Sequence, residues 1–433
     1  MSTVAEVKLW GRSIGAVFLD DGAENATFEY DSRFTQSGIE VSPIVMPLSS
    51  KIYSFPEISR RTFLGLPGLV ADSLPDKFGT ALLNAWLVRK GRDPGDFNPV
   101  ERLCYTGRRG MGALEYEPAT GPRSGKAKLL QVDELVELSS KILQEREELN
   151  QSFDPSVRET SLREILRIGT SAGGARAKAI IAWNPKTNEV RSGQVKAPDG
   201  FQYWLLKFDG VSKNRDHELD DPQGMGAVEY AYYKMATAAG IEMSECRLLE
   251  ENNRRHFMSK RFDRTDAGQK IHMQSLCALE HFDRSITGAY GYEQAFLTMR
   301  KLQLPMGSIE QQYRRMVFNI LARNQDDHTK NISFLMDDSG QWSLSPAYDV
   351  TYSYNPTGKW TAAQQMTMNG KRDNFTLNDF RECAKIAMLK RGRGEAILRE
   401  VQAVVVNWMD YAEEAGVDPI LSNTIQPAMR TID

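Results

Sequence analysis

Two adjacent carboxylates and an amide lie close together in the segment RNQDDHTKNISF, and a further carboxylate follows a short hairpin pattern. Asn331 stands five residues after Asp326, the first member of the DD pair, and Asp349 belongs to the later segment SPAYDV. In kinase-like phosphotransferases, an Asp accepts the proton of the substrate hydroxyl. An Asn five residues on and an Asp beyond the next hairpin hold magnesium. This order favours phosphoryl transfer, which depends mainly on positioning and charge neutralisation.

Each of these pieces also has a purely structural explanation. A DD pair is common in solvated turns, and the segment DDSG (337–340) has the composition of a hairpin turn. Asp349 follows Pro346 closely and could be a turn former. The combination of order and spacing, rather than any single residue, favours the kinase interpretation.

The composition is that of an ordinary soluble globular protein. The 433 residues are 41% hydrophobic and 26% charged, which allows two or three domains. The net charge is −3 and the isoelectric point is about 6.1, so no overall field favours nucleic acid. Contact with DNA would therefore require a local patch or a partner protein.

Cysteine and histidine spacing indicates neither a disulfide framework nor a zinc site. The four cysteines form no CxxC pair and the five histidines form no HExxH motif. The N-terminal stretch MSTVAEVKLWGR lacks the apolar core of a signal peptide, and no window is long enough to span a membrane. We therefore expect a cytoplasmic protein with reduced cysteines.

The predicted elements change in character along the chain. Residues 4–30 read as a β-meander, 63–90 as helix in two pieces, and 177–208 as a second β-rich region, whereas the chain is largely helical from 308 onward. A Pro-, Gly- and Lys-rich stretch at 117–128 resembles a linker. We expect an α+β fold with two lobes and a cleft between them: a small β-rich N-terminal lobe and a mainly α-helical C-terminal lobe. The expected domains are 1–120, 129–265 and 266–433.

The loop TSAGGARAK precedes a predicted strand and could bind an anion. Gly173 and Gly174 would let the backbone amides approach a phosphate, and Arg176 and Lys178 add positive charge. The GxxxxGK[ST] pattern of a P-loop is absent, so a plain β-turn is the alternative.

Lys207 interrupts the apolar strand YWLLKF. It points either to solvent or into the cleft toward nucleotide phosphates, as the strand lysine of kinases does, and the alternation does not decide between the two. A Glu on the next helix should pair with a lysine in the cleft. Glu229 is the candidate, with an ordinary surface position as its alternative.

The segment HFMSKRFDR is a candidate adenine-binding edge. Main-chain groups in 258–262 could bond the base while apolar side chains enclose it. Asp263 and Arg264 could form a structural ion pair, and Gln274 could reach the nucleotide.

Taken together, these motifs resemble the HipA-type serine/threonine kinases, the toxins of bacterial toxin–antitoxin pairs. The similar segments are SAGGARAK, YWLLKF, SKRFDR, NQDDHTKN and PAYDV, in that order. The N-terminal meander and GLVADSLPDKFG resemble the N-terminal subdomain of the family, so the resemblance covers nearly the whole chain. In the loop, Arg176 stands where the family usually has an amide.

The resemblance implies roles for individual residues. Asp326 would be the catalytic base, Asn331 and Asp349 would bind Mg²⁺, Lys207 would bind phosphate, and Ser171 would be autophosphorylated. The remaining residues expected to bind ATP are Gly173, Gly174, Ala175, Lys178, Lys260, Phe262, Gln274, His328 and Lys330.

The function that the resemblance implies is an ATP- and Mg²⁺-dependent protein serine/threonine kinase. Its target would be a translation component such as an aminoacyl-tRNA synthetase. Its partner would be a HipB-like DNA-binding antitoxin, with DNA reached only through that partner and no membrane involved. Two alternatives stay open: a kinase-fold binding module that acts as co-repressor with an antitoxin, and a small-molecule kinase of the aminoglycoside or choline type.

Overall fold

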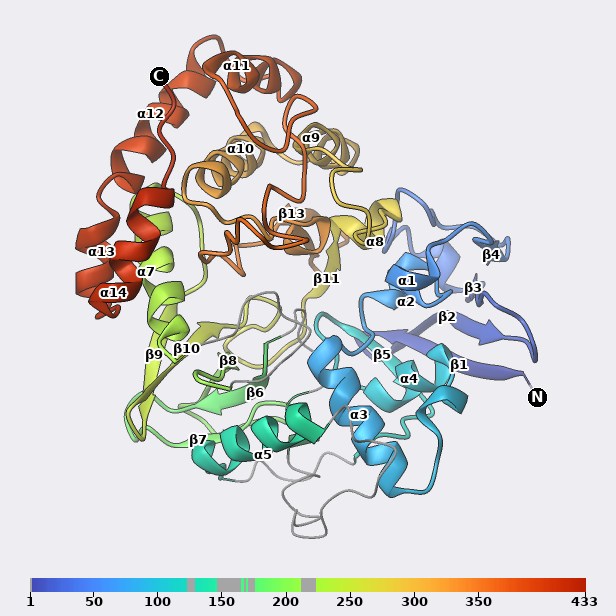
Figure 1. The fold of residues 1–433 in the computed structure, drawn as a ribbon. Coiled ribbons are helices and arrows are strands. Elements are labelled where there is room, and N and C mark those ends of the chain that lie inside the picture. Colours follow the sequence, from blue (N-terminus) through green and yellow to red (C-terminus); the bar gives the residue numbers. More distant parts are fainter. Residues whose placement is uncertain (1, 123–128, 146–164, 167–168, 170–175, 212–222) are drawn as a thin grey trace.

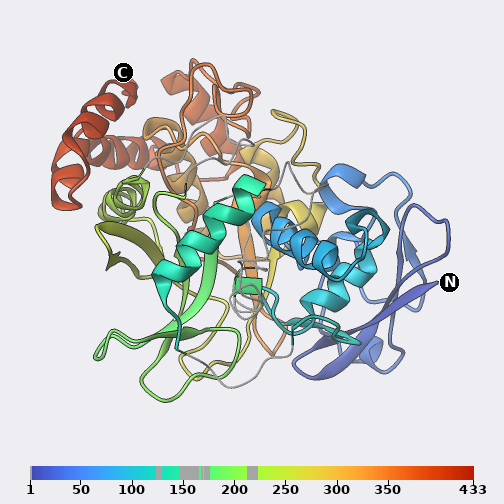
Figure 2. The same cartoon turned by 60° about the horizontal axis from the view of Figure 1, so that its bottom comes forward.

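The computed structural model describes residues 2–122, 129–145, 165–166, 169, 176–211 and 223–433. The described strands form three sheets, with strand orders β4-β3-β2-β1-β5, β7-β6-β8-β10-β9 and β11-β12-β13. The two termini lie on opposite sides of the molecule (Figures 1 and 2).

The first sheet is antiparallel and belongs to the N-terminal region, by which we mean residues 2–122. Alternate residues of its strands are buried, as expected for a sheet with one covered face. Its strands are β1 (Thr3–Leu9), β2 (Arg12–Leu19), β3 (Thr27–Tyr30), β4 (Tyr53–Ser54) and β5 (Leu114–Glu117). The helices of this region are α1 (Arg60–Phe63), α2 (Gly68–Ala71), α3 (Lys77–Arg89) and α4 (Pro99–Thr106).

Two helices begin where the sequence supplies a capping residue. The Asp76 side chain accepts a hydrogen bond from Gly79 N at the start of α3, and Asn98 forms a reciprocal capping box with Glu101 at the start of α4. The expected two-piece helix over 63–90 corresponds mainly to α2 and α3, which are separated at Pro75, and α1 ends at Phe63.

The second sheet is covered on both faces. Figures 1 and 2 show α3 beside α5, and apolar residues of both helices share a buried cluster with Trp204 and Leu206. Helix α7 packs against β9 and β10 and joins the buried cluster of the C-terminal helices. The elements are α5 (Val132–Glu145), β6 (Lys178–Trp183), β7 (Val190–Ser192), β8 (Gln202–Lys207), α7 (Met225–Ala238), β9 (Cys246–Glu251) and β10 (Arg254–Lys260).

The rest of the chain is mainly helical and surrounds the small third sheet (Figure 1). The strands are β11 (His272–Ser275), β12 (Ser333–Met336) and β13 (Trp342–Leu344). The helices are α8 (Leu276–Glu280), α9 (Tyr292–Lys301), α10 (Met306–Leu321), α11 (Leu377–Ile386), α12 (Arg393–Val405), α13 (Trp408–Glu414) and α14 (Pro419–Ile425). The expected arrangement of a β-rich lobe followed by a mainly helical lobe is confirmed. Within the described residues, no helix is both long and apolar enough to span a bilayer.

The N-terminal region is joined to the rest of the chain by contacts distant in sequence. The Trp10 indole donates to Lys270 O at 2.8 Å, and the Trp342 indole donates to Glu40 O at 3.2 Å. One apolar cluster contains residues of both α3 and β8, and another contains residues of both β1 and β12. The domain boundaries expected from the sequence stay a prediction, and these clusters cross them.

Candidate active site

Asp326 lies on the loop that connects α10 to β12, and hydrogen bonds fix both its backbone N–H and its carbonyl oxygen. The Ser353 hydroxyl accepts hydrogen bonds from Gln325 N at 2.7 Å and Asp326 N at 2.9 Å. The Asn331 side chain donates to Asp326 O at 2.9 Å. The carboxylate itself is 54% exposed, so the backbone is fixed while the acid group faces solvent. This combination suits a group that must meet an external substrate.

Asp327 differs completely from its neighbour. Its carboxylate is buried and accepts hydrogen bonds from Tyr292 Oη at 2.7 Å, Gln364 Nε2 at 3.1 Å and Gln365 N at 2.6 Å. Burial raises the pKa of Asp327 to about 6, although these donors oppose the rise. Asp327 therefore fastens the loop to α9 and to the segment around Gln365.

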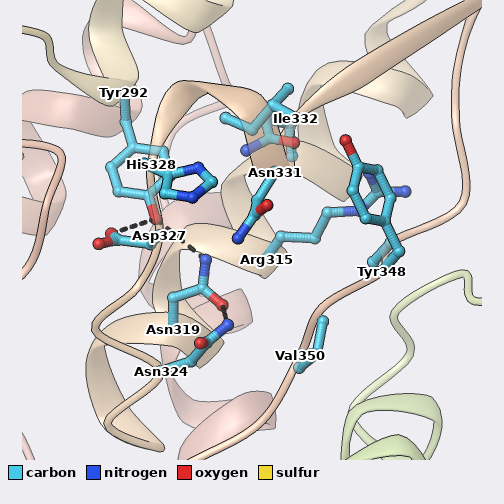
Figure 3. A pocket seen from close by; sticks show the side chains of 12 residues that line it. Tyr292, Arg315, Asn319, Asn324, Asp327, His328, Asn331, Ile332, Tyr348 and Val350 are labelled. Atoms are coloured by element: carbon cyan, nitrogen blue, oxygen red, sulfur yellow. Dashed lines mark hydrogen bonds between the residues drawn. The ribbon is translucent and has the colours of Figure 1, made fainter. Parts of the chain in front are cut away.

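A small polar pocket lies behind this loop (Figure 3). Figure 3 shows His328 and Asn331 on one side of it, and Tyr348 and Val350 on another. Because Asp349 stands between Tyr348 and Val350, the second carboxylate segment borders the same pocket as the loop. Burial lowers the pKa of the His328 imidazole, whose Nδ1 has no hydrogen-bond partner in the described part of the chain.

Lys207 joins two carboxylates from different parts of the chain. Its Nζ lies 2.5 Å from Glu229 Oε1 on α7 and also donates to Asp349 Oδ1. The sequence left open which face of the strand Lys207 occupies. Trp204 and Leu206 face the α3–α5 side, and Lys207 lies on the other face, toward α7.

The charges of this cluster stabilise one another. Burial would raise the pKa of Asp349, but the ammonium groups of Lys207 and Lys178 outweigh it and hold that pKa at about 2. Burial would lower the pKa of Lys207, but Asp349 and Glu229 outweigh it and raise the pKa above its usual value. Both groups are therefore charged near neutral pH.

Arg176 adds a second cation to Glu229. Its Nη1 lies 3.1 Å from Glu229 Oε2, so each oxygen of this buried carboxylate faces a different cation. The arginine that departs from the family pattern of the loop thus contacts the carboxylate that pairs with Lys207. Ser171, Gly173, Gly174 and Ala175 of the same loop lie outside the described residues.

Tyr348 connects the Asp349 segment to the Asp326 loop, and sequence reasoning missed it. Its hydroxyl donates to Lys330 O at 2.6 Å and lies 2.5 Å from Ser333 Oγ, while its ring lies 5.5 Å from that of Phe262. Its position directly before Asp349 in PAYD could have marked Tyr348 as a candidate site residue. Ser353, which holds Asp326, carries no comparable signal because serine is common in loops.

Three further residues expected to bind nucleotide lie in different surroundings. Lys260 pairs with Asp266 at 2.8 Å, and Lys330 lies 3.6 Å from Asp72. Gln274 is fully buried on β11, and neither polar atom of its amide has a hydrogen-bond partner among the described residues.

The donor chemistry fits magnesium better than a transition metal. Asn331 and Asp349 offer amide and carboxylate oxygens, the hard ligands that Mg²⁺ prefers. In the described part of the chain, no three His, Cys, Asp or Glu side chains are grouped so that they could hold a metal ion. Two protein oxygens are typical of sites in which substrate phosphates and water complete the magnesium shell.

A β-rich lobe against a helical lobe, with a lysine–carboxylate cluster at their junction, defines a protein-kinase-like fold. A family model described as the HipA-like C-terminal domain matches residues 170–409, and one described as the HipA N-terminal domain matches residues 5–117. The chain belongs to the HipA-like family.

A solved structure from the same family supports this fold. The complex of HipA, HipB and operator DNA from Shewanella oneidensis contains a chain that is 17% identical, with a TM-score of 0.68. The match covers 98% of this chain and 94% of that one. The proinflammatory kinase CtkA of Helicobacter pylori is 11% identical, with a TM-score of 0.31 over 52% of this chain and 92% of that one. No curated protein matches the chain.

Proposed function

We propose that the protein is an ATP- and Mg²⁺-dependent serine/threonine kinase that acts as a HipA-like toxin. One observation carries the proposal. A buried strand lysine, Lys207, contacts both Glu229 and Asp349, beside a fixed loop that presents the Asp326 carboxylate to solvent. Kinases need a lysine–glutamate pair, a metal-binding Asp and an accessible base in this relation.

Each residue has a separate task in the proposed reaction. Asp326 accepts the proton of the substrate hydroxyl, and Lys207 neutralises phosphate charge while Glu229 and Arg176 fix its position. Asn331 and Asp349 would hold magnesium, which when bound neutralises charge on the phosphates. Lys178 and Lys330 supply further positive charge, and His328, Phe262 and Gln274 would line the nucleotide site.

We also propose the partners that the family suggests. The related structure contains HipB and operator DNA, which supports a HipB-like antitoxin as partner, with DNA bound through it. The phosphorylated target would be a translation component such as an aminoacyl-tRNA synthetase. Ser171, which precedes β6 in the sequence, is the proposed site of autophosphorylation.

Intact-mass analysis of the purified protein incubated with ATP and Mg²⁺ tests the activity. We expect the wild type to gain the mass of one phosphoryl group, mapped by peptide analysis to Ser171, and Asp326→Asn to gain none. An equal adduct on Asp326→Asn would contradict the assignment of the base. If the protein binds nucleotide but transfers phosphate neither to itself nor to lysate proteins, a binding module explains the chain better.

A further inference from the structure

Two lysines lie directly opposite each other on neighbouring strands of the second sheet. Lys178 of β6 and Lys207 of β8 are register partners, so their side chains lie on the same face. Both are buried, with side-chain exposures of 2% and 6%. Like charges opposite each other destabilise a sheet, and buried ammonium groups need carboxylates nearby. The carboxylates near Lys207 are Glu229 and Asp349.

A carboxylate of the N-terminal region pairs with Lys178. Asp76 Oδ2 lies 3.4 Å from Lys178 Nζ, and Asp76 is itself only 5% exposed. Its other oxygen caps α3 through the 2.6 Å hydrogen bond from Gly79 N, so the helix end fixes the carboxylate. Burial raises the pKa of Asp76 to about 6 against the opposing influence of Lys178, which leaves the group mostly ionised above pH 7.

A second carboxylate of the same segment reaches the loop of Asp326. Asp72 Oδ1 lies 3.6 Å from Lys330 Nζ. The same carboxylate accepts hydrogen bonds from Ser275 N at 2.6 Å and Ser275 Oγ at 2.9 Å, which fasten it at the junction of β11 and α8. Asp72 and Asp76 stand four residues apart, on either side of Pro75. One short segment thus contacts a lysine from each lobe.

We propose that Asp72 and Asp76 are positioning residues of the active site, which hold Lys330 and Lys178 where both ammonium groups can meet the phosphates of the nucleotide. This inference rests on the proposed kinase function. It makes the N-terminal region a part of the phosphate-binding machinery, because both carboxylates come from that region. The two carboxylates act through the lysines and do not themselves touch the nucleotide.

A purely structural role makes a different prediction from a positioning role. If Asp76 only stabilises the fold, its loss lowers the melting temperature and leaves nucleotide affinity unchanged in the folded protein. If it positions Lys178, the loss weakens nucleotide binding, and the weakening depends on Lys178 being present. A double-mutant cycle separates these outcomes.

The test compares Asp76→Asn, Lys178→Met and the double variant. Asn remains a good helix cap, so α3 should keep its start. By calorimetry with ADP and Mg²⁺, we expect each single variant to bind about tenfold more weakly than the wild type, and the double variant no more weakly than Lys178→Met. Independent, additive losses would overturn the inference for Asp76. Asp93→Asn is the matched control, since Asp93 also caps a turn of the N-terminal region and its side chain faces solvent.

Asp72→Asn with Lys330→Met forms a second cycle, which keeps the inference testable if Asp76→Asn does not fold. In the wild-type background, we expect Asp72→Asn to raise the KM for ATP severalfold. In the Lys330→Met background, the same substitution should leave the KM unchanged. Wild-type protein that neither binds ADP nor transfers phosphate would refute the proposed function itself. Wild-type activity matched by both Asp variants would refute only the inference drawn here.

Discussion

Asp326 and Asp327 adjoin in sequence, yet only one of them is available to a substrate. The Asp326 carboxylate is 54% exposed, whereas Asp327 is buried beneath three hydrogen-bond donors. The sequence pattern selected Asp326 because Asn331 follows it by five residues. It could not show what Asp327 does, because its partners Tyr292, Gln364 and Gln365 lie more than thirty residues away.

Substitution of Asp326 should therefore affect phosphotransfer, whereas substitution of Asp327 should affect the stability of the fold. We expect Asp326→Asn to lower phosphotransfer by at least about 100-fold and to leave the melting temperature unchanged, because the carboxylate is exposed. We expect Asp327→Ala to lower the free energy of unfolding by about 2–4 kcal/mol, because three donors lose their acceptor. Urea unfolding beside a kinase assay measures both. A loss of stability in Asp326→Asn together with a loss of phosphotransfer alone in Asp327→Ala would contradict both assignments.

The pKa of Asp349 predicts a specific acid sensitivity. Its folded-state pKa is held at about 2, below the usual value of 3.8, so ionised Asp349 stabilises the fold above pH 4. This stabilisation, about 2 kcal/mol, is lost as the pH falls from 4 toward 2. In urea unfolding, the stability difference between wild type and Asp349→Asn should shrink over that interval. A difference that stays constant with pH would contradict the proposed ion pair with Lys207.

At the scale of elements, α7 is placed by a close contact with β10. A methyl group on Gly226 would lie 2.1 Å from Arg255 O, so only glycine permits this approach. Glu229 follows one helical turn later and reaches Lys207. The sequence predicted that Glu229 lies on a helix, because helical patterns are local.

Gly226→Ala should move α7 away from the sheet and separate Glu229 from Lys207. We expect a stability loss of about 1–3 kcal/mol and a larger fractional loss of phosphotransfer. Gly307→Ala on α10 is the matched control, since its methyl group would meet no described atom within 4 Å. That variant should match the wild type or gain up to about 1 kcal/mol. Wild-type phosphotransfer by Gly226→Ala would show that the position of α7 does not matter.

The orientation of Lys207 could not be predicted from the sequence, because helices cover both faces of its sheet. The second sheet is covered by α3 and α5 on one face and by α7 on the other. A strand buried on both faces shows no polar alternation, so YWLLKF carries no signal of direction. The contacts of Asp72 and Asp76 were hidden for another reason, since their partners lie on separate elements far along the chain.

At the scale of the whole molecule, Asp263 fastens the N-terminal region to the segment after β10. Its buried carboxylate contacts Arg261 at 2.6 Å and Arg264 at 2.7 Å, and accepts a 2.7 Å hydrogen bond from Gly112 N. The Arg264 guanidinium also donates to Gly112 O at 3.0 Å. The ion pair between Asp263 and Arg264 that was considered from the sequence is therefore present. Its hydrogen bonds to Gly112 join segments about 150 residues apart.

Removing this carboxylate should destabilise the entire protein. We expect Asp263→Asn to lower the free energy of unfolding by about 3–5 kcal/mol, because two buried guanidinium groups lose their counter-charge. Asp266→Asn is the control. Asp266 pairs with Lys260 but is 83% exposed, so its loss should change stability by less than about 0.5 kcal/mol. Thermal unfolding of the two variants beside the wild type measures this, and equal melting temperatures would contradict the structural role of Asp263.

Two tryptophans whose indoles join the N-terminal region to the rest of the chain can report on that contact by their fluorescence. Both tryptophans are partly buried. Trp10 lies in the N-terminal region and donates to Lys270 O, whereas Trp342 lies in the rest of the chain and donates to Glu40 O. Any separation of the N-terminal region would bring both rings into water and shift their fluorescence to longer wavelengths. With Trp10→Phe and Trp342→Phe to assign the signal, the protein carries its own emission probe for movement of that region when nucleotide or a partner binds.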